Sequence, residues 1–285
     1  MTEEPLSLLH KKILYGPLRS LALSVSEYSF ANLYLFRTEH AYSVLSGEGI
    51  FIRGTARNGD AYVMPTQDIH VMNKDLLDRM ISAYGMLFPV PEQWLDAFDP
   101  NAYTVTFDDA ESDYIHDIAK LASYQGNRLH AKKNLLNQFL ARYKAQALPL
   151  TNERLPDALA VLDAWQKESG EDPLKTDYTP CREALAFYED LVLCGAMYYV
   201  DGGPAGFIIG EELDPASFAL HFAKARREFK GIYQYMYNQF AQIMPSQYAV
   251  FNFEQDLGIE TLRRAKASYH PERMVKKYRV RLHTA

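Results

Sequence analysis

The sequence predicts an α+β protein of two consecutive domains, each with a mixed, mostly antiparallel sheet flanked by helices. Turn signals at 58–60 (Asn-Gly-Asp) and 201–203 (Asp-Gly-Gly) separate strand-like segments, which is typical of β-hairpins. The order of hairpins, helix, strand and helix occurs in both halves, and a repeated order indicates a repeated architecture. A short motif recurs as well, because Phe107-Asp108-Asp109 and Phe253-Glu254-Gln255-Asp256 each precede a helix, a Ser-Tyr pair and a basic run.

The first half begins with helical signals and continues with hairpins. A helix is predicted over Leu6 to Leu23 with an interruption near Gly16-Pro17, and the aromatic segment Phe30 to Phe36 suits either a helix or a strand. Apolar residues at helical spacing and β-branched or aromatic runs bounded by turns predict the remaining elements. These are strands at 41–45, 49–53, 61–65 and 103–107, and helices at 75–87, around Ile115, Ile118 and Ala122, and at 126–143.

The boundary between the domains is expected near Pro149 and Pro156, which gives domains at 1–148 and 149–285. The second half repeats the pattern of the first, with Gly195 as the stop signal of one helix. Its predicted helices are 157–165, 182–193, 231–244 and 259–269, and its predicted strands are 196–200, 206–210, 216–223, 249–251 and 275–282.

Composition indicates a globular protein of the reducing cytoplasm. The chain has 285 residues, of which 48% are hydrophobic and 23% charged, so it can bury a substantial core. Its two cysteines, Cys181 and Cys194, have no metal-ligand spacing, and metal dependence is not indicated. No apolar run is long enough to span a bilayer, and the first residues do not resemble a signal peptide. We therefore expect a cytoplasmic protein without integral membrane association.

The net charge of −6 argues against general binding of nucleic acid, but the basic residues are clustered. Three runs, at 128–144, 224–230 and 263–281, hold many of the lysines and arginines. Clusters of this kind on an acidic chain favour a localised anion, such as a phosphorylated cofactor or a short piece of RNA backbone. The alternative is that each run is a solvated helix face.

The segment 249–271 carries the strongest candidate site. Asn252, Glu254 and Asp256 alternate at the end of a predicted strand, and Gly258 allows a sharp turn into the next helix. Polar residues at the junction of a strand and a helix are typical of ligand sites in open sheets. In the alternative interpretation, Asp256 caps the helix and Glu254 faces water.

Three motifs, SYQGNRLHAKKNLLNQF, HFAKARREFKGIYQYMYNQF and FNFEQDLGIETLRRAKASYHPERMVKKYRV, span much of the chain. Together they resemble the DUF2156 family, bacterial proteins related to the C-terminal domain of phosphatidylglycerol lysyltransferase. The resemblance implies two tandem acetyltransferase-like (GNAT) folds, as in the peptidoglycan-bridge aminoacyltransferases. It also implies transfer of an aminoacyl group from a charged tRNA. Because no membrane-embedded segment is recognised, we expect a soluble acceptor, either a small molecule or a peptide.

The resemblance and the residue chemistry together suggest roles for the candidate residues. Glu254 or Asp256 would orient or deprotonate the acceptor, while Lys266 and Tyr269 would supply hydrogen-bond donors to the developing oxyanion. A further set is expected to bind substrate or phosphate: Arg128, Lys132, Lys133, Asn134, Lys224, Arg227, Lys230, Gly231 and Asn252.

Two other functions fit the same fold: an acyl-CoA-dependent N-acyltransferase, and a non-catalytic module that binds a related ligand. In acetyltransferases, the pyrophosphate loop carries Gln or Arg, two residues, Gly, one residue, and Gly or Ala. Around Gly231 this chain has Glu228 and Tyr233 instead, and a carboxylate and a large ring both disfavour a pyrophosphate. Acyl-CoA is therefore the less favoured donor, and the sequence leaves the oligomeric state open.

Overall fold

The computed structural model describes residues 1–283, which form two compact units. Unit 1 comprises 1–113, 255–259 and the segment from Met274 on, and unit 2 comprises 114–254 and 260–273. The units differ from the expected domains 1–148 and 149–285. The expected boundary falls at the end of β8 (Ala145–Pro149), and β8 pairs along its length with β9 (Cys194–Val200) within unit 2. Residue 149 therefore belongs to a sheet and not to a linker.

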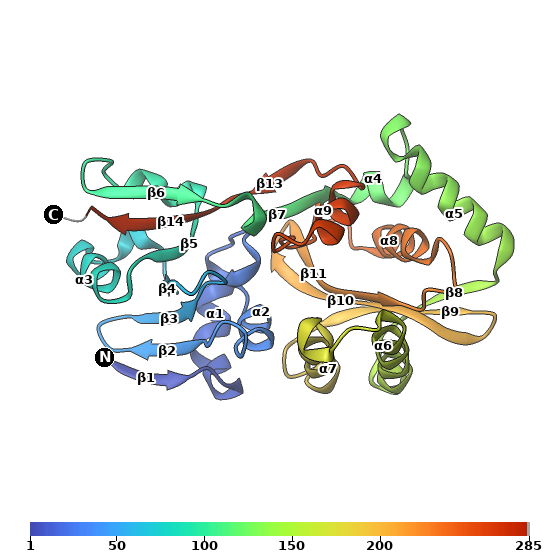
Figure 1. The fold of residues 1–285 in the computed structure, drawn as a ribbon, viewed down its shortest axis with the longest axis horizontal. Helices are drawn as coiled ribbons and strands as arrows, with labels where there is room; N and C mark the ends of the chain where they lie inside the picture. Colours follow the sequence, from blue (N-terminus) through green and yellow to red (C-terminus); the bar gives the residue numbers. More distant parts are fainter. Residues whose placement is uncertain (284–285) are drawn as a thin grey trace. The chain divides into compact units, whose positions relative to one another are not determined.

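A seven-stranded sheet forms the centre of unit 1, in the order β1-β2-β3-β4-β5-β14-β6 (Figure 1). Its neighbours are antiparallel except β4 and β5, and β14, from the end of the chain, lies between β5 and β6. The elements are β1 (Thr2–Pro5), α1 (Lys11–Ser20), α2 (Phe30–Leu35), β2 (Ser43–Ser46), β3 (Ile50–Thr55), β4 (Ala61–Pro65), α3 (Lys74–Tyr84), β5 (Leu87–Pro91), β6 (Tyr103–Phe107) and β14 (Lys277–Leu282).

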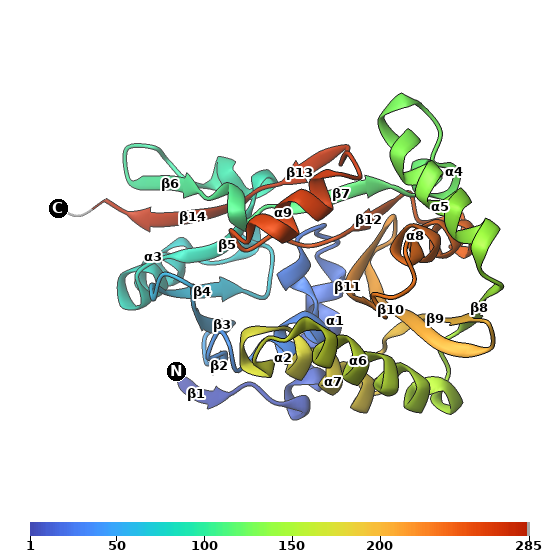
Figure 2. The same ribbon diagram turned by 45° about the vertical axis from the view of Figure 1, so that its right-hand side comes forward.

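Unit 2 contains a second seven-stranded sheet, in the order β13-β7-β12-β11-β10-β9-β8. Helices α6 and α7 cover one face of strands β8 to β11, and α5 and α8 lie on the opposite face (Figures 1 and 2). The remaining elements are β7 (Asp113–Asp117), α4 (Ile118–Ser123), α5 (His130–Arg142), α6 (Leu155–Ser169), α7 (Tyr178–Ala186), β10 (Gly203–Asp214), β11 (Ser217–Ala225), α8 (Ile232–Ile243), β12 (Val250–Asn252), α9 (Glu260–Ala267) and β13 (Arg273–Val275).

The predicted fold class is confirmed: both units are mixed, mostly antiparallel sheets flanked by helices. Both hairpin turns predicted at 58–60 and 201–203 connect antiparallel strands. The ambiguous segment Phe30 to Phe36 is helical, because Ser29 caps α2 by accepting a hydrogen bond from the Asn32 amide.

Four element predictions were wrong. The helix expected to reach Leu87 ends at Tyr84, and β5 follows as a fully buried strand without polar alternation. Ile115 lies in strand β7, where both faces are buried and periodicity gives no signal. The helix expected at 182–193 is α7, which begins earlier and ends at Ala186. Helix α1 continues through Gly16-Pro17 without the expected interruption and ends at Ser20.

Aromatic packing fixes the end of β12 in unit 2. Phe251 stacks on Phe240 of α8 with ring centroids 5.6 Å apart, and Phe253 packs on Tyr237 at 4.9 Å. Burying rings of this size stabilises a core by about 1.5 to 3 kcal/mol each. The chain that follows β12 therefore leaves the sheet from a rigid position.

Candidate functional site

A bulge in β11 presents His221. In the pairing with β10, Leu220 lies opposite Gly210 and Phe222 opposite Ile209, so His221 is the extra residue. Bulges redirect a side chain locally and are frequent beside functional sites. A Cβ at Gly210 would lie 2.0 Å from the Ala219 carbonyl oxygen, so the close approach of the strands at the bulge requires glycine there.

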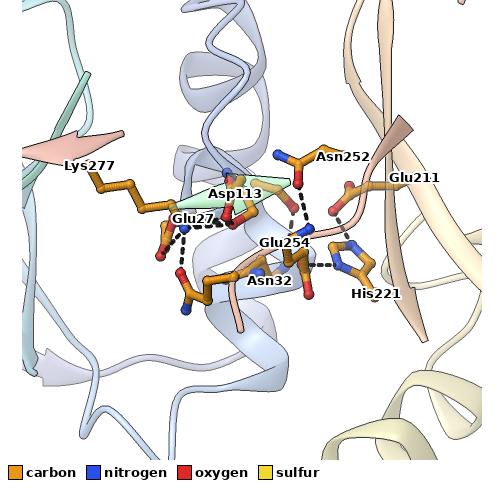
Figure 3. A network of polar contacts seen from close by, with 11 residues as sticks. Glu27, Asn32, Asp113, Glu211, His221, Asn252, Glu254 and Lys277 are labelled. Carbon is orange, nitrogen blue, oxygen red and sulfur yellow. Dashed lines mark hydrogen bonds and ion pairs between the residues drawn. The ribbon is translucent and has the colours of Figure 1, made fainter. Parts of the chain in front are cut away.

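Two carboxylates hold the His221 ring (Figure 3). Its Nε2 lies 2.9 Å from Glu211 Oε1 in β10, and its Nδ1 lies 2.8 Å from Glu254 Oε1 beyond β12. Strand β12 pairs with β11 in parallel only as far as Asn252, and the chain then turns. Glu254 adopts a positive φ of 58°, and its amide donates to Asn252 Oδ1 at 2.6 Å. The turn directs the Glu254 carboxylate towards the bulge.

The two carboxylates determine the charge of His221. Complete burial of the side chain favours the neutral ring, but Glu254 and Glu211 outweigh it and raise the pKa of His221 to about 10. The ring is therefore an imidazolium at neutral pH, with both nitrogens donating. Glu254 remains 13% exposed at its side chain. This arrangement holds a carboxylate in one orientation while leaving part of it accessible.

A second cluster in unit 2 contains Lys132 and Tyr269. The Lys132 ammonium lies 3.9 Å from the centroid of the Tyr269 ring and donates to Ser268 Oγ at 2.6 Å. The Tyr269 hydroxyl accepts a hydrogen bond from Gln234 Nε2 at 2.9 Å. Burial raises the pKa of Tyr269 and lowers that of Lys132. Residues of all three sequence motifs thus meet at Tyr269, with Lys132 over its ring and Gln234 donating to its hydroxyl.

Lys266 acts on the same cluster through His116. Burial, followed by the positive charge of Lys266, lowers the pKa of His116 to about 3, so this ring is neutral. The His116 ring packs on Phe253 with centroids 4.4 Å apart and on Tyr269 at 6.3 Å. Neighbouring residues of the candidate segment therefore serve different clusters: Phe253 contacts the Tyr269 side, and Glu254 contacts His221.

The candidate residues at 224–231 have structural partners. Lys224 is buried, pairs with Asp177 at 2.6 Å, and lies 3.8 Å from the Trp165 ring centroid. The Arg227 amide donates to Glu168 Oε2 at 2.9 Å. Gly231 has φ 93°, and a Cβ there would lie 2.6 Å from the Leu135 carbonyl oxygen, so α5 packs directly against this glycine.

The other predicted binding residues divide into exposed and buried ones. Arg128, Lys133, Asn134 and Lys230 are exposed to solvent. Asn252 is fully buried, and its side chain holds the Glu254 amide. The structure therefore gives Asn252 a role in shaping the turn.

Asp256 belongs to unit 1. It is 1% exposed, its Oδ1 accepts from the Gly258 amide at 2.8 Å, and its carbonyl accepts from the Ile259 amide at 2.9 Å. These bonds close the turn that precedes α9. The contacts support the alternative role for Asp256, in which it caps the turn into the helix.

Sequence reasoning missed several members of the two clusters. Glu211, Ser268 and Gln234 were not predicted, and the sequence alone does not favour a catalytic over a structural role for His221. One signal was available: Glu211 is a charged residue in a strand that is otherwise almost entirely buried, and such a residue needs a partner. The bulge that supplies the partner depends on strand pairing, which the local sequence does not determine.

The fold and the carboxylate-held histidine define a two-unit α+β protein with a polar site at the end of a short parallel strand pair. The family model for the C-terminal region of phosphatidylglycerol lysyltransferase matches residues 18–281, and this chain belongs to that family. The family is named after an enzyme that transfers a lysyl group, which is an aminoacyl group.

Solved structures of similar proteins agree with the fold. A Bacteroides thetaiotaomicron protein of unknown function is 25% identical, with a TM-score of 0.86 over 99% of this chain and 100% of its own. A C-terminal DUF2156 domain from Agrobacterium fabrum is 14% identical, with a TM-score of 0.62 over 98% of this chain and 93% of its own.

A curated relative matches part of the chain. An uncharacterized protein of Mycoplasmoides gallisepticum is 24% identical over 188 residues, which are 61% of this chain. The match spans 57% of the length of that relative.

Two features are absent from residues 1–283. None of the helices in this range combines the length and the apolar character needed to cross a bilayer. Within the same range, no three or more His, Cys, Asp or Glu side chains are grouped so that they could hold a metal ion.

Proposed function

We propose that this chain transfers an aminoacyl group from a charged tRNA to a soluble acceptor, a small molecule or a peptide. The observation that carries the proposal is the Glu254 carboxylate, which is fixed by a buried imidazolium and remains partly accessible. Membership of the lysyltransferase family supports the same class of reaction. The family supplies the reaction type, and Glu254 supplies the position at which an acceptor is oriented.

The reaction joins the acceptor to the ester carbonyl of the donor. The lone pair of the acceptor amine or hydroxyl attacks this carbonyl, the C–O bond to the terminal ribose breaks, and the proton lost by the acceptor ends on the ribose oxygen. Glu254 accepts a hydrogen bond from the nucleophile and fixes its direction of approach. His221 is a positioning residue in this scheme, because it acts through Glu254 and Glu211. Orientation of this kind contributes a large part of enzymatic rate enhancement.

Donor groups for the developing oxyanion come from Lys266 and Tyr269 in the proposal. Burial keeps the Tyr269 hydroxyl protonated; it accepts a hydrogen bond from Gln234 and interacts with the Tyr124 hydroxyl, so in the proposal its hydrogen turns from Tyr124 to the oxyanion. Lys266 contributes a positive charge that already acts on the buried His116 ring. Preorganised donors of this kind typically contribute about 3 to 4 kcal/mol each to the transition state.

The start of α5 is the proposed contact for the tRNA backbone. Arg128 and Lys133 are exposed there, together with Asn134, and Lys132 joins them from the Tyr269 cluster. Helix starts favour anions through their free amides and their dipole. The alternative donor, acyl-CoA, is disfavoured by the packing of α5 against Gly231, because this packing accounts for the glycine without a ligand.

A direct test measures aminoacyl transfer. The full chain is incubated with tRNA charged with radiolabelled amino acids and with hydroxylamine, a small nucleophile that traps the aminoacyl group. We expect enzyme-dependent formation of the hydroxamate of at least one amino acid. Glu254→Gln and Lys266→Ala should each lower the rate by about 100-fold, as expected when a catalytic group or oxyanion donor is lost. A parallel reaction with acetyl-CoA should release no thiol.

Glu260→Gln is the matched control, because Glu260 is an exposed carboxylate in α9 whose partner is the exposed Arg264. It should transfer at the wild-type rate. Transfer that is as fast in Lys266→Ala as in wild type would contradict the role of Lys266. Release of thiol from acetyl-CoA without aminoacyl transfer would contradict the proposal and indicate an acyl-CoA-dependent N-acyltransferase.

A further inference from the structure

Unit 1 contains a pocket of about 260 Å³ to which no role has been assigned. Its inner wall includes the buried rings of Tyr42, Tyr62 and Phe88, and the exposed residues Arg57 and Asn58 also line it. Pockets for drug-sized ligands measure about 300 to 1,000 Å³. The smaller volume fits a metabolite of a few heavy atoms.

The pocket wall contains an ion pair with two unsatisfied atoms. Arg279 in β14 and Glu111, just before β7, form this pair, and both side chains line the pocket. Glu111 Oε2 and Arg279 Nε are buried without hydrogen-bond partners. A buried acceptor and a buried donor without partners each cost free energy, and native structures rarely keep them without a reason. Both atoms lie beneath the pocket surface, and the carboxylate and the guanidinium that contain them are on residues that line the pocket.

The charges around the pocket are mixed. Three carboxylates line it, on Glu27, Asp108 and Glu111, together with the guanidinium groups of Arg57 and Arg279. A lining with both signs disfavours purely anionic ligands and suits a ligand that carries both charges. An α-amino acid carries its ammonium and its carboxylate on the same α carbon, which matches an acceptor and a donor held together in one ion pair.

We propose that this pocket binds a free α-amino acid, with its ammonium on Glu111 and its carboxylate on Arg279. The aromatic walls hold the side chain of the amino acid, since ring faces accept both aliphatic groups and cations. The proposal concerns residues of unit 1 alone and is independent of aminoacyl transfer by the Glu254 site.

Isothermal titration of the full chain tests the pocket. L-lysine, L-alanine and L-glutamate are titrated separately up to about 10 mM, a range that detects millimolar affinity. We expect saturable one-to-one binding of at least one of them. The N-acetyl derivative, which lacks the ammonium, and the amide, which lacks the carboxylate, should each bind at least about tenfold more weakly, since each leaves a charged partner unpaired.

Two variants locate the site. Glu111→Gln should weaken binding at least about tenfold by removing the charge that faces the ammonium. Ala110→Trp should abolish binding by filling the pocket while the ion pair stays intact, which covers the case that Glu111→Gln fails to fold. Ala141→Trp, at an exposed position of α5, is the matched control and should bind as wild type.

Failure of all three amino acids to bind, or equal binding by wild type, Glu111→Gln and Ala110→Trp, would overturn the proposal. The titration contains no tRNA, so its result is separate from the transfer assay. Transfer without amino-acid binding would contradict the pocket alone, and binding without transfer would contradict the proposed reaction alone.

Discussion

Each unit buries a cation between two carboxylates, but the cations differ. In unit 1, the Lys277 ammonium lies 2.7 Å from both Glu27 and Asp113, with additional bonds to Ser26 and Gln255 (Figure 3). In unit 2, the His221 imidazolium lies between Glu211 and Glu254. Lysine keeps its charge at every physiological pH, whereas histidine holds its charge only through its partners.

The difference in cation changes which group titrates. In unit 1, burial raises the pKa of Glu27 to about 7 even though Lys277 lowers it, so a carboxyl of this network titrates near neutral pH. In unit 2, the pKa of the histidine itself is displaced, to about 10. At neutral pH the lysine network therefore contains a titrating carboxyl, whereas the histidine network keeps a single charge state and holds Glu254 in one orientation. We infer that the histidine network is the one suited to a site.

The largest expected effect comes from removing the permanent cation. Lys277→Met would leave Glu27 and Asp113 buried without it, and breaking a buried pair from one side typically costs about 3 to 5 kcal/mol. The free energy of unfolding in urea should fall by this amount. Lys276→Met, one residue earlier and outside the network, should cost less than about 1 kcal/mol. Equal losses in the two variants would show that the network does not stabilise unit 1.

The second prediction concerns the histidine network and its pH dependence. His221→Gln should lower the free energy of unfolding by about 2 to 4 kcal/mol at pH 7, because the amide cannot neutralise two buried carboxylates. The folded pKa of about 10 exceeds the ordinary value of 6.5, so the stabilisation by His221 is complete below pH 6.5 and is lost as the pH rises through 10. The difference between wild type and variant should shrink over that window. A constant difference from pH 6 to 10 would contradict a charged His221.

The same comparison shows what the sequence can and cannot predict. Glu254 and Tyr269 could be named as candidates because they belong to a local pattern of polar residues, a turn and a helix. Their partners His221, Glu211 and Gln234 were not found, because each comes from another strand or helix and meets them only through long-range pairing. The final strand was predicted, but its insertion between β5 and β6 of unit 1 was not. A strand pattern indicates which side chains are buried, but it does not indicate which strand is the neighbour.

The third prediction concerns the pH dependence of the lysine network. The raised pKa of Glu27 means that its contribution to stability is complete below pH 4.5 and is lost as the pH rises through about 7. Glu27→Gln removes this titration. The stability of wild type relative to the variant should therefore decline between pH 4.5 and 7, by about 1 to 3 kcal/mol. Glu48→Gln, at an exposed carboxylate, is the control. A wild-type advantage that grows with pH would mean that Lys277 dominates over burial.

The smallest effect tests whether burial, and not charge pairing alone, distinguishes the two networks. Arg264 and Glu260 form an ion pair at 2.7 Å, as short as the contacts of Lys277, but both side chains are more than half exposed. Exposed pairs at this helical spacing contribute about 0.3 to 0.5 kcal/mol, since water solvates both ions in the unpaired state. Glu260→Gln should therefore shift the free energy of unfolding by less than about 0.5 kcal/mol, and added salt should erase the shift. If Glu260→Gln lowered the free energy of unfolding as much as Lys277→Met, distance alone would determine the strength of these ion pairs. Burial would then not distinguish the two networks from an exposed pair.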